Sequence, residues 1–295
     1  MSFVRLGDSV ANMKIYDFPV LRAIPNSIRG KAHLCRFILR LLLPKRGLVC
    51  VRGKNGLEFE LDGPRGVIPH YILANGLYEE SVIQEIVNVC PLNGVFLDVG
   101  ANVGSISIPV AKFRPDLKVI SIEADPSVYE MLVRNVERNS VNNVETVSAL
   151  VTRSEGVEFI FHRADEDFFG MGSIGTKTGN NDLKLKSTTI DKILSVRGVQ
   201  QVDVMKMDIE GAEYLAFQGA EECLKDLKVA IFEFNDWSEE NMAGVEVGDS
   251  QRFLLGRGYS LSKMDSSRTV LSQPLLIGSS MLIATKQAHR FAMLK

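Results

Sequence analysis

The feature of this sequence that most restricts its fold is a regular alternation of apolar strands and amphipathic helices, which begins at Val95. In chain order, "VFLDVG" reads as a strand, "NVGSISIPVAKFR" as a helix, "KVISIEA" as a strand, "DPSVYEMLVRNVERNS" as a helix and "VETVSALV" as a strand. Parallel strands need crossover connections, which helices supply, so this order predicts a parallel sheet. Asp125, with Pro126 directly behind it, predicts the N-cap and first turn of the second helix.

The pattern continues towards the C-terminus with a strand over Val202–Met207, a helix from about Gly211 to Asp226 and the strand "KVAIFEFN". A helix and two more strands are expected in "RFLLGRGYSLSKM" and "SSMLIATK". Residues 152–200 are less regular: "GVEFIFH" predicts a strand and "TTIDKILSVRG" a strand-to-helix segment. The polar segment "RADEDFFGMGSIGTKTGNND" between them has the length of a lid or binding loop.

The N-terminal region has a different character. Between Arg22 and Lys54 there are nine basic residues and no acid. The stretch "RGKAHLCRFILRLLLPKR" predicts an amphipathic helix that ends at Pro44 and carries a stripe formed by Arg29, His33, Arg36 and Arg40. Either the helix packs its apolar face on the main domain or a second subunit and leaves the basic stripe in water, or residues 29–46 contact an anionic membrane or an acidic or lipid-linked substrate. A nucleic-acid partner is disfavoured, because the segment lacks a series of aromatic side chains for base stacking.

A β-hairpin is expected next, in "LVCVRGKNGLEFELDG", because Asn55 and Gly56 tolerate the positive φ angles of a tight turn. The following "HYILANGLYEESVIQEIVNVC" reads as a loop that leads into a helix starting near Ser81 and ending before Pro91. We therefore expect an N-terminal extension over residues 1–75, made of the basic helix and the hairpin, and a main domain over residues 76–295.

Cysteine and histidine spacing argues against a metal or disulfide scaffold. The four cysteines are far apart without a CxxC pair, and the histidines show no metal-binding spacing, so a reducing, cytoplasmic location is expected. The first thirty residues lack the apolar run of a signal peptide, and the longest apolar runs are too short to span a bilayer. We expect a soluble protein, and its oligomeric state stays open.

A cofactor-binding loop is predicted in "DVGANVGSI", where the first strand of the pattern ends. Open α/β sheets bind ligands at such strand ends. The candidate residues are Asp98, Gly100, Asn102 and Gly104, with Glu123 at the tip of the next strand as acceptor for a ribose diol. A dinucleotide would favour GxGxxG, but Asn102 and Ser105 occupy the second and third glycine positions. The loop therefore fits S-adenosylmethionine, which has no pyrophosphate, better than NAD.

Charged side chains also end the strand "VDVMKM". Lys206 and Asp208 share one side of the strand, and Glu210 joins them if the chain is still extended. Lys206 could keep the acids ionised. Asp208 is the first candidate for base or substrate-orienting acid, Glu210 the second, and Glu233 the third, since its strand should lie beside this one. Structural alternatives are a plain ion pair for Lys206, a helix-start acid for Glu210 and a satisfied buried group for Glu233, while His162 is an alternative base.

A metal-dependent variant uses the same edge of the sheet. Hard oxygen ligands for Mg²⁺ are offered by Asp208, Glu210, Glu233, Asn235 and Asp236. Metal-free chemistry is favoured, because the sequence contains no familiar metal-binding spacing.

Three segments, "FLDVGANVGSISIPVAK", "ISIEADPSVYEMLVRNV" and above all "KMDIEGAE", resemble the FkbM-type methyltransferases, a branch of the Rossmann-like S-adenosylmethionine-dependent enzymes. The resemblance runs from about Leu77 to Gly258. It implies a mostly parallel seven-stranded sheet with helices on both faces and a reversed last strand, and O-methylation of a sugar hydroxyl or polyketide-type alcohol. By motif position it adds Tyr78 and Glu79 as cofactor contacts, Ser148 and Ala149 near the adenine, and Gly211 in the block after the fourth strand.

The expected function is S-adenosylmethionine-dependent O-methylation of a hydroxyl on a sugar or secondary metabolite. N-methylation, an NAD-dependent oxidoreductase and a non-catalytic cofactor-binding protein on the same fold are the alternatives. Contacts to the small-molecule or glycan acceptor are expected from "DEDFFGMGSIG" and from the N-terminal region, neither of which names the acceptor.

Overall fold

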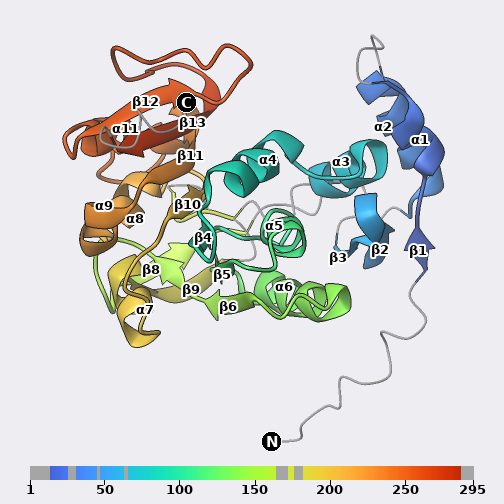
Figure 1. Cartoon of the computed structure of the whole chain (residues 1–295), viewed down its shortest axis with the longest axis horizontal. Coiled ribbons are helices and arrows are strands. Elements are labelled where there is room, and N and C mark those ends of the chain that lie inside the picture. The colour runs from blue at the N-terminus through green and yellow to red at the C-terminus, as the bar shows by residue number, and fades with distance from the viewer. Residues whose placement is uncertain are drawn as a thin grey trace, which may run out of the picture.

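The centre of the computed structural model, which describes residues 14–25, 31–44, 47–62, 66–163, 172–175 and 182–286, is a seven-stranded sheet (Figure 1). Its strands are β4 (Val95–Val99), β5 (Lys118–Glu123), β6 (Val144–Ser148), β10 (Val204–Met207), β11 (Val229–Asn235), β12 (Tyr259–Lys263) and β13 (Ser279–Lys286). They lie in the order β12-β13-β11-β10-β4-β5-β6. β13 runs in the direction opposite to the other six strands of this sheet, so the predicted α/β sheet with a reversed last strand is confirmed.

Helices cover both faces of this sheet. They are α4 (Glu80–Val89), α5 (Ser107–Phe113), α6 (Pro126–Asn139), α7 (Ile190–Val196), α8 (Glu213–Gln218), α9 (Glu221–Asp226), α10 (Asp236–Glu240) and α11 (Asp249–Leu255). Neighbouring side chains of one strand enter opposite cores: Phe96 of β4 belongs to one hydrophobic cluster and Leu97 to the other. Burial on both faces explains why the strands read as near-continuous apolar runs. Asp125 accepts a hydrogen bond from the Ser127 amide, as the predicted N-cap of α6.

The predicted single helix over residues 211–226 is wrong, because the chain breaks between α8 and α9. A Cβ on Gly219 would lie 2.1 Å from the backbone oxygen of Thr152, so the backbone approaches a neighbouring segment too closely for a side chain. The middle section forms a small sheet of β7 (Leu150–Val151), β8 (Glu158–Phe161) and β9 (Leu183–Thr188), in the order β7-β9-β8. Most of the expected lid loop, residues 164–171 and 176–181, lies outside the described residues.

The N-terminal region contains the predicted hairpin and helix. Its elements are β1 (Ile15–Tyr16), α1 (Pro19–Ala23), α2 (Lys31–Leu42), β2 (Val49–Arg52), η1 (Lys54–Gly56), β3 (Glu58–Leu61) and α3 (Val67–Asn75). Asn55 and Gly56 have φ angles of 56° and 73°, and the Leu57 amide donates to the Lys54 carbonyl, which confirms the turn. The loop expected at "HYILAN" is wrong: it belongs to α3, which buries Ile72 and Leu73. No described helix combines the length and apolar character needed to cross a bilayer.

Two asparagines of α6 join the hairpin to the main sheet. Asn135 accepts from the Glu60 amide at 2.6 Å and donates to the Glu60 carbonyl at 3.0 Å, while Asn139 makes the same pair of bonds with Glu58 at 2.9 and 2.7 Å. The side-chain amide of Asn135 also donates to the Val103 carbonyl at 3.0 Å. The two asparagines of α6 thereby bind the backbone N–H and C=O groups at the edge of β3, as a neighbouring strand would.

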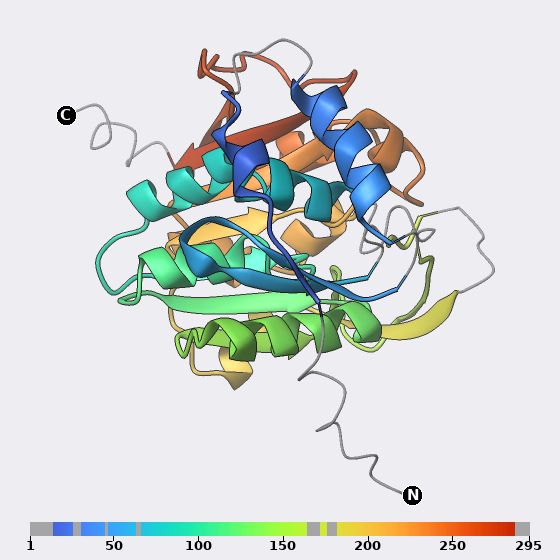
Figure 2. The same cartoon turned by 90° about the vertical axis from the view of Figure 1, so that its right-hand side faces the viewer.

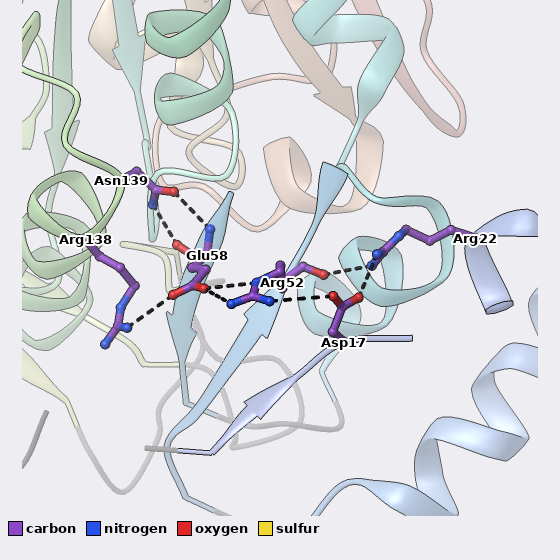
Figure 3. A network of polar contacts seen from close by, with 6 residues as sticks. All are labelled: Asp17, Arg22, Arg52, Glu58, Arg138 and Asn139. Carbon is purple, nitrogen blue, oxygen red and sulfur yellow. Dashed lines mark hydrogen bonds and ion pairs between the residues drawn. The ribbon is translucent and has the colours of Figure 1, made fainter. Parts of the chain in front are cut away.

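Ion pairs extend this connection across the N-terminal region (Figure 3). Arg52 of β2 donates to Glu58 at 2.6 Å and lies 4.0 Å from Asp17, which in turn pairs with Arg22 of α1 at 2.6 Å. Glu58 also lies 3.5 Å from Arg138 of α6. A continuous set of polar contacts therefore links α1, the hairpin and α6. Buried residues of α2, β3 and α3 share one hydrophobic cluster with β4 and β5, so the N-terminal region packs directly on the main sheet (Figure 2).

Candidate active site

A pocket opens where the strand order reverses, between β10 and β5 on either side of β4. The register places Lys206 of β10 directly beside Asp98 of β4, so charged groups from separate strands meet at this edge. The pocket lining includes the loop Gly100–Val103, Glu123 at the end of β5, and Lys206 with Asp208 at the end of β10. This is the position at which open α/β sheets bind ligands.

The loop after β4 is fixed on both sides. The Gly100 and Ala101 amides both donate to the Ile122 carbonyl, at 3.0 and 2.9 Å. Gly100 has a φ of 77°, and a Cβ there would lie 2.0 Å from the backbone oxygen of Asp208. Glycine is required at this position because the loop and the end of β10 are in backbone contact.

Glu123 lies beside this loop and is held by two backbone amides. One carboxylate oxygen accepts from the Asn102 amide and the other from the Asp125 amide, both at 2.9 Å. Burial raises the pKa of Glu123 to about 7, and these two hydrogen bonds partly oppose that shift. The carboxylate keeps lone pairs for the hydroxyls of a ligand in the pocket.

Lys206 stands at the centre of a buried group of acids. Its Nζ lies 3.3 Å from Asp208 and 3.9 Å from Asp98. Burial by itself lowers the pKa of Lys206, but Asp208, Asp98 and Glu79 outweigh it and raise the pKa, so the ammonium stays charged. Asp98 is fully buried, and burial raises its pKa although the Ser107 hydroxyl donates to it. The predicted pairing of Lys206 with a strand-end acid is confirmed.

Tyr78 and Glu79 approach the same ammonium from the segment before α4. Tyr78 lines the pocket, and burial raises the pKa of its hydroxyl. Glu79 has a left-handed backbone with a φ of 45°. Burial raises the pKa of its carboxyl group, although Lys206 lowers it, and its Oε2 is buried without a hydrogen-bond partner among the described residues. Glu79 is absent from the described lining of the pocket, so it acts on the site through the Lys206 ammonium.

Three acids converge at the rim of the pocket. Oxygens of Asp208, Glu210 and Glu233 lie within 4.8 Å of one another. Burial, and next the neighbouring Asp208, raise the pKa of Glu233 to about 7, well above the usual value for a glutamate. The condition under which Glu210 would share the side of Lys206 and Asp208, an extended chain, is not met: its φ is 56°, and it reaches the other acids through a tight turn.

The remaining candidates are less central. Ala149 lines the pocket, whereas the described lining does not include Gly104, Ser148 or His162. His162 instead pairs with Asp182 at 2.9 Å. Two of the residues considered for Mg²⁺ have other partners: Asn235 caps α10 by accepting from the Ser238 amide, and Asp236 accepts from the amides of Trp237 and Gly278.

Sequence reasoning missed one contribution to the site and anticipated a second only in general terms. Glu213, the last letter of "KMDIEGAE", is buried, and burial raises its pKa well above the usual value. Its carboxyl group accepts from the Ile209 amide at 2.8 Å and so shapes the turn that carries Asp208 and Glu210. The second contribution is a wall formed by the N-terminal region, namely Leu61, Asp62 and residues 66–69. An acid beside the first turn of a helix was the available signal for Glu213. The N-terminal region was expected to contact the acceptor, but the sequence did not identify the residues of the wall.

The charge of the pocket distinguishes among ligands. Carboxylates of Asp62, Glu123, Asp208 and Glu210 line it, and Lys206 is the single basic side chain in the described lining. Lys206 already neutralises acids, so a pyrophosphate would face mainly negative groups. The charge of the described lining therefore favours a cationic ligand over a dinucleotide.

Comparison with known proteins places this site in a family. Residues 98–261, more than half of the chain, match the Methyltransferase FkbM domain. The methyltransferase sdnD of Sordaria araneosa is 24% identical over 183 residues, which cover 51% of this chain and 70% of that protein. The AMB antimetabolite synthetase AmbE of Pseudomonas aeruginosa is 23% identical over 208 residues, 57% of this chain but only 10% of AmbE. The O-methyltransferase from Bacillus cereus in complex with SAH is a similar solved structure, with 14% identity, a TM-score of 0.42, and coverage of 70% of this chain and 80% of that one.

The match spans the loop after β4, the end of β5 and the acid-bearing end of β10, which line much of the pocket, whereas Tyr78 and the wall at Leu61, Asp62 and residues 66–69 lie outside it. The chain therefore belongs to the FkbM family of S-adenosylmethionine-dependent methyltransferases.

Proposed function

We propose that this protein methylates a hydroxyl oxygen of a sugar or secondary metabolite and that Asp208 accepts the hydroxyl proton. The observation that carries the proposal is the group formed by Lys206, Asp208 and Glu233 at the rim of a pocket that also contains Glu123. S-adenosylmethionine, when bound, supplies an electrophilic methyl group. The carboxylates of Asp62, Asp208 and Glu210 in the pocket lining suit its cationic part, and the lone pairs of Glu123 suit its ribose.

Asp208 is suited to proton acceptance because Lys206 holds its carboxylate at 3.3 Å and Gly100 contacts its backbone. An alcohol is a weak nucleophile until its proton leaves, and a positioned base contributes about 10²- to 10⁴-fold to the rate. Glu233 is hydrogen-bonded to Asp208 and titrates near neutral pH, so it can take the proton from Asp208 onward. Correct orientation of the acceptor contributes more, about 7–11 kcal/mol. We assign that role to the pocket wall formed by residues 66–69 and Tyr78.

The first experiment is calorimetry with S-adenosylmethionine and its demethylated product. Wild-type protein is expected to bind both, and Glu123→Gln to bind each about 10- to 100-fold more weakly, because a charge-assisted hydrogen bond contributes about 1.5–3 kcal/mol. Glu155→Gln is the matched control, since Glu155 is an exposed glutamate and lies outside the described lining. If the wild-type protein bound neither compound, the proposal would be wrong. An unchanged affinity of Glu123→Gln would mean that the ribose does not contact Glu123.

The acids at the rim also satisfy the spacing of a divalent-cation site, so metal removal is a second test. We expect EDTA-treated protein to methylate its acceptor at an unchanged rate, because Lys206 already supplies positive charge beside Asp208 and Asn235 and Asp236 have other partners. The acceptor is found by screening sugars and hydroxylated metabolites for release of the demethylated cofactor. Loss of activity with EDTA and recovery with Mg²⁺ would instead make these acids metal ligands.

A further inference from the structure

The outward side of α2 combines exposed apolar and basic side chains. The helix packs against the protein through Cys35, Leu39 and Leu43, which recur at every fourth position. On the opposite side, Phe37 is 63% exposed and Leu41 70% exposed. The expectation that only basic residues of this helix face water is therefore incomplete.

Helical spacing resolves this side into two stripes. Leu34, Phe37 and Leu41 are three and four positions apart and form an apolar stripe. His33, Arg36 and Arg40 each directly precede one of these residues, so they form a basic stripe parallel to the apolar one. All three basic side chains are exposed. We call these six residues the α2 docking face. Large apolar side chains gathered on one surface of a soluble domain mark an interaction site.

The charge of the surrounding chain favours one kind of partner. Residues 22–54 carry nine basic residues and no acid, within a chain that has a net charge of −2. A second copy of this chain would place Arg36 and Arg40 opposite like charges across a two-fold axis, which is unfavourable. An anionic lipid surface meets both stripes, because it offers phosphates to the arginines and an acyl boundary to Phe37 and Leu41.

We propose that the α2 docking face attaches this protein to the surface of an anionic lipid bilayer. The helix lies in the plane of the surface, with Phe37 and Leu41 inserted below the headgroups and Arg36 and Arg40 among them. α2 lies on the outside of the molecule, with no described element over its outward side (Figure 2). It packs on α3, whose first turn lines the pocket at Val67–Pro69, so docking brings the pocket wall close to the bilayer.

Co-sedimentation of the full chain with vesicles tests the proposal. Wild-type protein is expected to sediment with vesicles of phosphatidylcholine and phosphatidylglycerol and far less with phosphatidylcholine alone, and added salt should weaken its binding. Phe37→Glu combined with Leu41→Glu should reduce the bound fraction on anionic vesicles by about tenfold or more, because two charges would enter the apolar boundary. Arg36→Glu combined with Arg40→Glu should reduce binding and also remove its dependence on phosphatidylglycerol.

Matched controls come from the opposite end of the molecule. Val196 at the end of α7 is also 70% exposed, so Val196→Glu controls for an exposed apolar residue, and Arg153→Glu controls for an exposed arginine. Both controls are expected to bind as the wild type does. The proposal is overturned if the wild type does not bind anionic vesicles, or if Phe37→Glu with Leu41→Glu binds as well as the wild type. A concentration-dependent dimer that this double variant abolishes, without vesicle binding, would assign the face to a second copy.

Discussion

Asp208→Asn is expected to lower the turnover number by about 10²- to 10⁴-fold while binding of S-adenosylmethionine stays within a few-fold of the wild type. The amide retains the shape of the side chain and its contact with Lys206, but it cannot accept the proton of an alcohol. Asp208 also lies outside the Glu123 end of the pocket, where the ribose is expected. Steady-state kinetics with the identified acceptor gives the rate, and calorimetry gives the cofactor affinity.

The pH dependence of the wild-type turnover rate tests whether Asp208 passes its proton to Glu233. Because the pKa of Glu233 is raised to about 7, the rate of the wild type should rise with pH through that value, as Glu233 becomes able to take the proton from Asp208.

Glu210→Gln is the control for Asp208→Asn, since it removes a neighbouring acid without removing the contact between Asp208 and Lys206. If Glu210→Gln lost as much turnover as Asp208→Asn, or more, the base would be Glu210 instead.

Lys206→Met should give the largest loss of stability in the site, about 3–5 kcal/mol at pH 8, because it leaves buried carboxylates without a cation. Asp98 is completely buried, its pKa is already raised, and its nearest cation is the Lys206 ammonium at 3.9 Å. Methionine preserves most of the side-chain volume, so lost charge dominates lost packing. Urea unfolding of the variant and the wild type gives the difference.

The loss should depend on pH with a defined sign. A carboxyl group whose pKa is higher in the folded than in the unfolded state stabilises the fold at low pH and loses that contribution as pH rises. Removing Lys206 raises the folded-state pKa of Asp98 further, so the deficit should be smaller at pH 5 than at pH 8. Lys184→Met, which breaks an exposed ion pair with Glu158, should change stability by no more than about 1 kcal/mol. A deficit of equal size at both pH values would point to packing instead.

The sheet was predictable from the sequence because its signals are local and repeated. Apolar strands alternate with helices from Val95 onward, and handedness rules restrict how such units connect. Pairing of Lys206 with Asp208 followed from side-chain alternation along one strand. The break between α8 and α9 did not follow, because it depends on the approach of Thr152 to Gly219, a contact between segments far apart in the chain.

A contribution of the N-terminal region to the pocket was expected, but the residues that form its wall were not predictable, for a related reason. The placement of the wall depends on the hydrogen bonds from Asn135 and Asn139 of α6 to the backbone of β3. The sequence does not show which segment these asparagines contact. Asparagine is unfavourable inside helices, so two of them four residues apart in α6 were a signal that something outside the helix holds them. The position of Glu210 was not predictable for another reason. Its positive φ is imposed by the surrounding turn, and a glutamate in the sequence gives no sign of it.

The asparagine joint between α6 and the hairpin has a consequence for how such enzymes could diversify. Asn135 and Asn139 bind the backbone of β3, so these four hydrogen bonds do not depend on which side chains β3 carries. A hairpin of different sequence could occupy the same place and leave the Val103 carbonyl in the cofactor loop supported. The sequence of β3 can thus vary without loss of this joint, provided that Phe59 and Leu61, which belong to the hydrophobic cluster shared with the main sheet, are replaced by apolar residues of similar size.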